Sequence, residues 1–169
     1  MKFIDETKIR AIAGDGGPGC VSFHRAKFVR RGPADGGNGG HGGDVVAIAD
    51  PQLSTLLDLR YRKEWKANPG KRGGDADCDG RRGDDCIIKV PVGTLIRDVV
   101  SGELLADLKT PGELAVIAAG GRGGKGNAHF ASSTNRSPRF CQPGEPGVER
   151  DLEVELRLLA DVGIIGLPN

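Results

Sequence analysis

Two glycine motifs in this chain have the spacing of a turn that binds phosphate. Residues 14–19 (GDGGPG) and 121–126 (GRGGKG) both match GxGxxG, and each follows a strand-like segment. In dinucleotide-binding proteins this turn opens a helix whose N-terminus receives the pyrophosphate. The residues VSF follow the first motif, and a polar run without apolar periodicity follows the second, so neither is followed by the required helix. We therefore interpret neither motif as a nucleotide site.

The last residues of the sequence carry a second phosphate-binding signature. An apolar stretch beginning at residue 159 ends in Gly166, Leu167, Pro168 and Asn169, which match the first four positions of the P-loop pattern GxxxxGK[ST]. The lysine and the hydroxyl residue that would hold phosphate and magnesium are not among the 169 residues. Taken alone, the stretch is more typical of a strand followed by an incidental turn.

Other reactive side chains favour neither a catalytic nor a metal site. Five aspartates between residues 75 and 85 lie among glycines without the bidentate glutamate of an EF-hand, which favours a solvated loop over a calcium site. The four cysteines lack CxxC spacing and the three histidines are scattered, which is typical of thiols in a reducing cytosol. No Ser/His/Asp, Cys/His or paired-carboxylate arrangement is present. We predict no catalytic residue, metal ion or cofactor for these 169 residues themselves.

The length and the hydropathy pattern bound the class of protein. A chain of 169 residues is expected to form one domain. Its first residues, MKFIDETKIR, are charged and lack the apolar segment of a secretory signal. No apolar stretch approaches the roughly 20 residues that cross a bilayer. We therefore expect a cytoplasmic protein that does not interact with membranes.

Basic side chains are concentrated in three stretches of the sequence. Residues 16–34, 59–74 and 114–144 hold 14 of the 24 Lys and Arg residues but one of the 23 Asp and Glu residues. This partition predicts a molecule with one strongly positive end, which suits a polyanion such as nucleic acid. Arginines that only keep loops soluble are the alternative. Several aromatic residues lie close in sequence to these basic residues. They could stack on unpaired RNA bases, or they could equally fill the ends of the packed glycine helices. They are Phe23, Phe28, Tyr61, Trp65, Phe130 and Phe140.

Glycine recurs with a period of three residues. Doublets repeat along 36–43 (GGNGGHGG) and 120–126 (GGRGGKG), and 28 of the 169 residues are glycine. This period is that of the left-handed polyproline II helix, which has no internal hydrogen bonds. Such helices are stable in a domain only when they pack side by side, and glycine lets their backbones approach closely. We assign this structural role to Gly37, Gly40, Gly43, Gly121 and Gly124.

Strand-like segments lie between the glycine tracts. Strands are expected at 3–13, 45–49, 86–100 (broken at 91–93), 104–108, 114–119 and 152–158, and one short helix at 51–60. The glycine tracts between them are 14–19, 32–43, 70–83, 120–126 and 143–147. The pattern predicts a mostly-β fold, a sheet or small β-barrel that carries a bundle of glycine-rich polyproline-II-type helices. Flexible glycine loops are the alternative.

The combination of these stretches resembles the N-terminal glycine-rich domain (Obg fold) of the Obg family of ribosome-associated GTPases. The resemblance covers essentially the whole chain, with NPGKRGGDADCDGRRGDD matching in kind more than in wording. The matching stretches are FIDETKIRAIAGDGGPGCVSF, GPADGGNGGHGGDVV, VPVGTLIRD, GGRGGKGN, PGEPG and LEVELRLLADVGIIGLPN.

The resemblance implies a fold and a parent enzyme. The fold has six left-handed glycine-rich helices over an eight-stranded barrel, here in a domain of residues 1–158. Residues 159–169 then begin a Ras-like GTPase domain with a truncated P-loop. The whole protein would bind GTP, GDP and Mg²⁺ and hydrolyse GTP, whereas the present residues lack that catalytic domain.

The resemblance also implies partners. The family docks on the large (50S) ribosomal subunit, with glycine-rich loops reaching 23S rRNA near the peptidyl-transferase centre, and acts in subunit maturation and stress-linked growth control. A structural module that docks a protein partner or its own G domain is the alternative. The basic residues assigned to the three loop tips are Arg25, Lys27, Arg30 and Arg31, then Lys71, Arg72, Arg81 and Arg82, and last Arg136 and Arg139.

Overall fold

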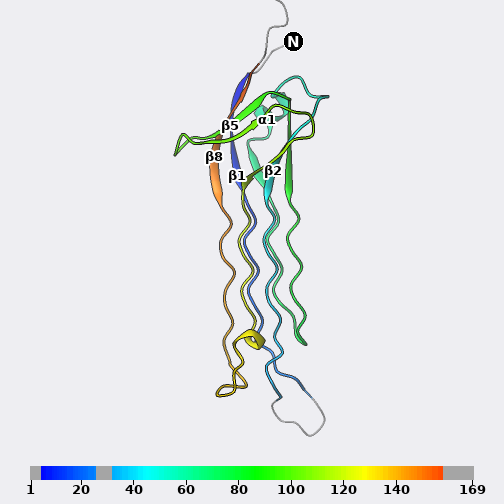
Figure 1. Cartoon of the computed structure of the whole chain (residues 1–169), viewed down its shortest axis with the longest axis vertical. Coiled ribbons are helices and arrows are strands. Elements are labelled where there is room, and N and C mark those ends of the chain that lie inside the picture. Colours follow the sequence, from blue (N-terminus) through cyan, green and yellow to red (C-terminus); the bar gives the residue numbers. More distant parts are fainter. Residues whose placement is uncertain (1–4, 26–31, 158–169) are drawn as a thin grey trace, which may run out of the picture.

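The computed structural model describes residues 5–25 and 32–157 and shows an elongated molecule with two distinct ends (Figure 1). The strands and a short helix lie at one end, and extended segments without regular secondary structure run from them to the other. The predicted mostly-β class is therefore confirmed. None of the helices in the described residues has the length and apolar character needed to span a membrane.

Eight strands occur in the described residues, and most of them lie where the apolar pattern predicts a strand. Their bounds are Glu6–Ile12 (β1), Val45–Ala49 (β2), Glu64–Lys66 (β3), Cys86–Val90 (β4), Thr94–Asp98 (β5), Leu104–Leu108 (β6), Leu114–Ala118 (β7) and Glu149–Leu156 (β8). The short strand β3 was not predicted, because its three residues lie in a basic stretch without apolar alternation.

The predicted helix at 51–60 is wrong in position and length. The structure has a helix of five residues, Leu57–Tyr61 (α1). The N–H of Gln52 donates to the Asp50 carboxylate at 3.0 Å, and the N–H of Leu53 donates to the Asp50 carbonyl oxygen at 3.2 Å. These bonds make a turn at the position where the leucine spacing predicted the start of the helix.

The strands form two hydrogen-bonded sheets. The larger sheet has the order β3-β1-β8-β5-β6, and the smaller has the order β4-β2-β7. The β1–β3 and β2–β4 pairs are parallel, whereas β8 and β7 are antiparallel to β1 and β2. The predicted closed barrel is not found among the described strands. Closure needs ladder bonds between the edge strands, and β3 ends after three residues where the chain leaves the sheet.

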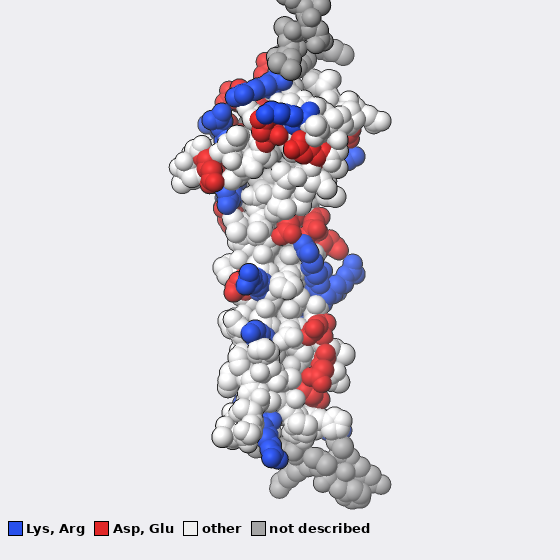
Figure 2. Space-filling view, in the orientation of Figure 1, with Lys and Arg blue, Asp and Glu red and all other residues white. Residues whose placement is uncertain are grey.

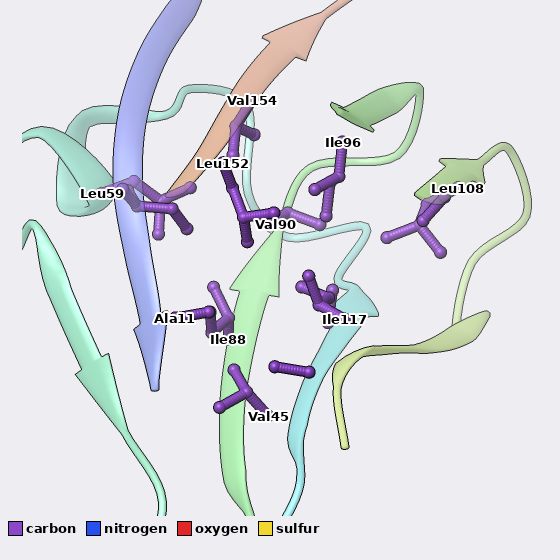
Figure 3. Packing of buried hydrophobic residues seen from close by; sticks show 14 of the residues in the cluster. Ala11, Val45, Leu59, Ile88, Val90, Ile96, Leu108, Ile117, Leu152 and Val154 are labelled. Carbon is purple, nitrogen blue, oxygen red and sulfur yellow. The ribbon is translucent and has the colours of Figure 1, made fainter. Parts of the chain in front are cut away.

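The hydrophobic core lies between the two sheets. Leu152, Val154 and Leu156 alternate with exposed or half-buried residues along β8, so one face of this strand is buried, as its sequence predicts. They pack with Ile88 and Val45 of the smaller sheet (Figure 3). This core occupies only the strand end of the molecule, which is consistent with a chain that is only 37% apolar.

Six extended glycine-rich segments leave or re-enter the sheets within the described residues. Their ranges are 13–20 (segment 1), 36–44 (segment 2), 67–74 (segment 3), 78–85 (segment 4), 119–126 (segment 5) and 141–148 (segment 6). Each is continuous with a strand, in the order β1, β2, β3, β4, β7 and β8. They form three out-and-back excursions, because odd-numbered segments leave the sheets and even-numbered ones return. The tract expected at 70–83 is thus two segments joined by a turn.

Hydrogen bonds between the segments follow the three-residue period. In segment 1, Gly14 and Gly17 donate their N–H groups to the carbonyl oxygens of Gly43 and Gly40 in segment 2, at 2.9 and 2.8 Å. Gly16 instead donates to Glu145 of segment 6, at 2.9 Å. In segments 1 and 2, two of every three N–H groups bond to neighbouring segments, and the third residue of each triplet faces outward. Segments 4 and 6 donate one N–H group per triplet to the backbone of a neighbouring segment. Backbone groups that lack a partner within their own segment are satisfied in this way.

The segments lie too close together for side chains at the contact positions. A Cβ atom on Gly37, Gly40 or Gly43 would overlap the carbonyl oxygen of a residue in segment 4. Gly121 and Gly124 face carbonyl oxygens of segment 6 in the same way. All five glycines assigned a structural role therefore lie at contacts that admit no side chain.

Close approach, rather than an unusual backbone conformation, explains these glycines. The glycines with positive φ among the described residues are Gly93, Gly102 and Gly112, and all three lie in turns between strands. Gly126, at the end of segment 5, has φ −72° and ψ 167°, near the polyproline II region that the three-residue period predicts.

We expect Gly40→Ala to destabilise the fold and Gly74→Ala to leave it nearly unchanged. The new Cβ at Gly40 would overlap the carbonyl oxygen of Arg81, whereas the nearest atom to one at Gly74 is the Cys78 Cβ at 3.3 Å. Overpacking of this kind costs about 1–3 kcal/mol. Thermal unfolding measures the difference, at roughly 2–4 °C per kcal/mol for a chain of this size. Equal melting temperatures for the two variants would contradict the close-packing argument.

Candidate nucleic-acid interface at the end of the glycine bundle

The first and third excursions extend beyond the second and meet at the far end of the molecule (Figure 1). We call this the distal end and define it as the described residues 21–25, 32–34 and 128–140. The N–H of Ala34 donates to the carbonyl oxygen of Arg136 at 3.4 Å, and the hydroxyl of Ser137 donates to that of Gly32 at 3.4 Å. The tips of two excursions are therefore joined into one surface.

Asn127 fixes the distal end to the bundle. It begins the short 3₁₀ helix Asn127–Phe130 (η1), and its side chain is fully buried. Its Oδ1 accepts the N–H of Gly36 at 2.9 Å, and its Nδ2 donates to the carbonyl oxygens of Ser22 and Pro138 at 2.9 and 3.0 Å. One side chain thus connects two points of the first excursion, Ser22 and Gly36, with Pro138 at the tip of the third.

Residues 21–25, 32–34 and 128–140 carry arginines and histidines but no carboxylate, although the neighbouring Asp35 carboxylate lies 4.0 Å from the Nδ1 of His24. Arg25, Arg136 and Arg139 are exposed, and none of them forms an ion pair within the described residues. Phe140 is 55% exposed beside Arg139, and its ring centroid lies 4.9 Å from that of Phe130. Lys27, Arg30 and Arg31 lie outside the described residues. This end thus offers cations and an exposed aromatic ring together.

The second excursion ends differently from the prediction. Its turn, between segments 3 and 4, carries Asp75 and Asp77, and the predicted basic residues Lys71, Arg72, Arg81 and Arg82 lie along the flanks of the bundle instead. The guanidinium of Arg81 pairs with Asp84 at 3.3 Å. Arg82 pairs with Asp44 at 2.7 Å and with Asp85 at 3.1 Å. The second tip is therefore acidic, and two of its four predicted cations are paired with carboxylates.

The predicted single positive end also needs correction. Four basic residues of the stretch 59–74 belong to α1, β3 or the residues between them, at positions 60, 62, 63 and 66. They lie beside the sheets, at the opposite end from the distal arginines. Figure 2 accordingly shows basic and acidic side chains along the length of the molecule. The stretches that are basic in sequence are thus divided between two ends in space.

The structure describes the first GxGxxG motif but not the P-loop positions. In the first GxGxxG motif, Gly14, Gly16, Gly17 and Gly19 all donate their N–H groups to neighbouring segments, so these groups are not available to a phosphate. The P-loop positions Gly166, Leu167, Pro168 and Asn169 lie outside the described residues. Within the described residues, no group of three or more His, Cys, Asp or Glu side chains is arranged to hold a metal ion.

Four of the five aspartates between residues 75 and 85 have side-chain partners within the described residues. Asp79 Oδ1 accepts the backbone N–H of Asn38 at 2.8 Å, and Asp85 Oδ1 accepts that of Asp44 at 2.8 Å. The Asp75 carboxylate accepts the thiol of Cys20 at 3.5 Å. Burial raises the pKa of the Cys20 thiol, and the bond to Asp75 raises it further. This cysteine is therefore a structural thiol rather than a nucleophile.

Sequence reasoning missed the polar side chains that hold segment 5. Asn38 Oδ1, His41 Nδ1 and Asp44 Oδ1 accept the N–H groups of Gly126, Gly123 and Gly120, at 3.0, 3.4 and 2.6 Å. These acceptors are spaced three residues apart, and so are the glycines that donate to them.

The structural role of Asn127 was also missed, although the three-residue spacing of the glycines indicates that this position is buried. Asn127 occupies the position that follows Gly121 and Gly124 at three-residue spacing, where a buried residue is expected. A polar side chain at an inward position must find partners inside the bundle.

We expect Asn127→Asp to destabilise the protein and loosen the distal end. The substitution keeps the side-chain volume but replaces the donor to Ser22 and Pro138 with an oxygen, which leaves two carbonyls unpaired around a buried charge. Each unsatisfied buried group costs about 1–3 kcal/mol. Amide hydrogen exchange should accelerate at Gly36, and the melting temperature should fall. Asn135→Asp is the control, because it makes the same change at an exposed residue of the same tip; equal effects would contradict the role of Asn127.

Known proteins are similar to this sequence over its whole length. A family model described as GTP1/OBG matches residues 4–158. The GTPase Obg of Anaeromyxobacter dehalogenans (strain 2CP-C) is 58% identical over 169 residues, which are 100% of this chain and 48% of that protein. The GTPase Obg proteins of Persephonella marina (strain DSM 14350 / EX-H1) and Myxococcus xanthus (strain DK1622) are 56% and 55% identical, again over 100% of this chain, which covers 50% and 35% of their lengths.

The chain thus spans half or less of the curated relatives it matches, and it corresponds to their N-terminal part. The resemblance inferred from the glycine tracts is confirmed: this chain belongs to the GTP1/OBG family.

Proposed function

We propose that this chain is the part of an Obg-type GTPase that docks on the large ribosomal subunit, with its distal end against 23S rRNA near the peptidyl-transferase centre. The observation that carries the proposal is the distal end itself, where Arg25, Arg136 and Arg139 are exposed and form no ion pair within the described residues. A phosphate backbone attracts such a surface, and unpaired RNA bases can stack on the exposed ring of Phe140. This docking would serve maturation of the subunit and growth control under stress.

The bundle supplies the rigidity that this role requires. Ordering a flexible loop on binding costs about 1–2 kcal/mol per residue in backbone entropy. The six segments are ordered by hydrogen bonds before any RNA is present, and they carry few side chains at their contacts. A slender and already ordered element can enter a narrow RNA cavity without that loss.

The proposal extends to the whole protein. The relatives are called GTPase Obg, and the present chain covers half or less of them. We propose that residues 1–158 form the docking domain and that residues 159–169 begin a GTPase domain whose P-loop starts at Gly166. GTP, GDP and Mg²⁺ would bind in that domain, so the 169 residues alone should not hydrolyse GTP. We propose a cytoplasmic location, which is compatible with a ribosomal partner.

A second candidate function is docking of a protein, such as the GTPase domain of the same molecule. The outer face of the smaller sheet exposes Ile87, Leu114 and Val116, at 57%, 63% and 58%. In the strand register, Ile87 and Val116 both lie opposite Val46. An apolar row of this kind suits a protein partner. It lies at the sheet end, so both docking modes are compatible with one molecule.

Replacement of Arg136 and Arg139 by Glu should weaken binding to large subunits and leave the fold intact. Both side chains are exposed, so circular dichroism and melting temperature should not change. Co-sedimentation with large subunits over a series of salt concentrations measures binding, which should fall more steeply with salt for the natural chain than for the variant.

The matched control for this experiment is Lys63→Glu/Lys66→Glu. It makes the same change in net charge on exposed lysines beside the sheets, far from the distal end. Equal losses in the two variants would show that binding depends on overall charge rather than on the distal end. Unchanged co-sedimentation of the Arg136/Arg139 variant would exclude the proposed docking surface.

A further inference from the structure

A groove runs along one flank of the bundle and reaches the distal end at His129, which is one of its lining residues. It has a volume of about 490 Å³ and lies over segment 2, between segments 4 and 5. Its lining includes Asn38, His41, Arg82, Arg122 and Lys125. In Figure 2 an uncharged strip runs along the bundle, with mainly basic side chains on its left and both acidic and basic side chains on its right. No role assigned to the distal end uses these residues.

The three-residue period builds this groove. Segment 2 bonds to both neighbours, because Gly80 of segment 4 donates its N–H to the carbonyl oxygen of Asn38 at 2.7 Å, and Gly39 donates to that of Gly124 in segment 5 at 2.7 Å. The inward glycines make these contacts, so the third residues of the triplets face solvent. Asn38 and His41 form the floor, and Arg122 and Lys125 stand one triplet apart on one wall.

The polar floor is set to donate hydrogen bonds. Asn38 Oδ1 and His41 Nδ1 accept the N–H groups of Gly126 and Gly123, at 3.0 and 3.4 Å. The acceptor atom of each side chain is therefore used within the bundle. The amide Nδ2 of Asn38 and the Nε2–H of His41 remain, and both are donors. A ligand that accepts hydrogen bonds fits this floor.

The walls are positive on balance. Arg82, Arg122 and Lys125 face one carboxylate in the lining, Asp79, whose Oδ1 already accepts the Asn38 N–H at 2.8 Å. Arg82 is held by Asp44 and Asp85 through one of its nitrogens. Within the described residues, Arg122 and Lys125 form no ion pair and their side chains form no hydrogen bond. Two cations are thus available to an anion in the groove.

We propose that this groove is a second RNA-binding site, in which Arg122, Lys125 and the donors of Asn38 and His41 hold the phosphodiester backbone of a strand that runs along the bundle. Successive third residues of a polyproline II helix are about 9 Å apart, so the two cations are set along a line rather than around one point. An extended polyanion fits this arrangement better than a single phosphate ion. The inference rests on the proposed function, because it gives the docked domain a contact along its flank as well as at its tip.

NMR titration of the ¹⁵N-labelled chain with a single-stranded twelve-nucleotide oligouridylate tests the site. We expect the amide signals of Gly123 and Gly126 to shift, because their acceptors His41 and Asn38 contact the strand. The substitutions Arg122→Gln/Lys125→Gln should abolish these shifts. They should also reduce the slope of log K against log salt concentration by about 1.4, which is two contacts at about 0.7 each for single strands. Well-dispersed spectra of the variant show that it is folded.

The variant Arg136→Gln/Arg139→Gln separates this inference from the proposed function. Groove shifts that persist in it, and vanish in the Arg122/Lys125 variant, support a flank site independent of the tip. Shifts confined to residues 130–140 in the natural chain, with none at His129 or elsewhere in the groove, would overturn the flank site and leave the distal docking surface standing. Inorganic phosphate is the second probe: groove shifts of equal size at equal phosphate-group concentration would overturn the extended-strand assignment in favour of a site for a single anion.

Discussion

The structure depends on the contact between the backbone of one glycine segment and a carbonyl oxygen of the next. At Gly40 and Gly124 this contact leaves no volume for a Cβ atom, and the N–H groups beside it are bonded across segments. An ordinary domain orders its chain by burying apolar side chains, yet only 37% of this sequence is apolar and the core is confined to the sheets. Beyond the sheets, satisfied backbone groups and close packing replace that core.

The same contact determines which residues meet solvent. In segments 1, 2 and 5 two positions of each triplet face neighbouring segments, so the third is the one available for surface chemistry. In segment 2 these positions hold Asn38, His41 and Asp44, and all three bond back to glycine N–H groups of segment 5. In segment 5 they hold Arg122 and Lys125, which make no such bonds within the described residues. The triplet therefore separates side chains that hold the bundle from side chains that remain available to a partner.

Much of this architecture is predictable from local patterns, and the errors have a common cause. Alternation along β8 and the break between β4 and β5 are local, so the sequence predicts them well. The glycine period likewise predicts which positions admit no side chain. Sheet closure depends on pairing between distant edges, and the position of Lys63 and Lys66 depends on β3, which has no apolar pattern. The acidic tip of the second excursion was missed for a related reason, because a run of glycines does not show where the chain reverses.

The bundle also depends on the sheets for its register. Strands β1 and β3, and strands β2 and β4, pair in parallel, and the segments that continue them remain hydrogen-bonded neighbours. The N–H of Ala67 bonds to Ile12 at 2.9 Å and that of Cys86 bonds to Asp44 at 2.8 Å, so the ladders pass from sheet to bundle without a gap. A slip of one residue in a sheet would move glycines out of the contact positions and place side chains where carbonyl oxygens lie. The hydrophobic core at one end thus holds the distal arginines in place at the other, although no apolar packing of the sheets reaches them.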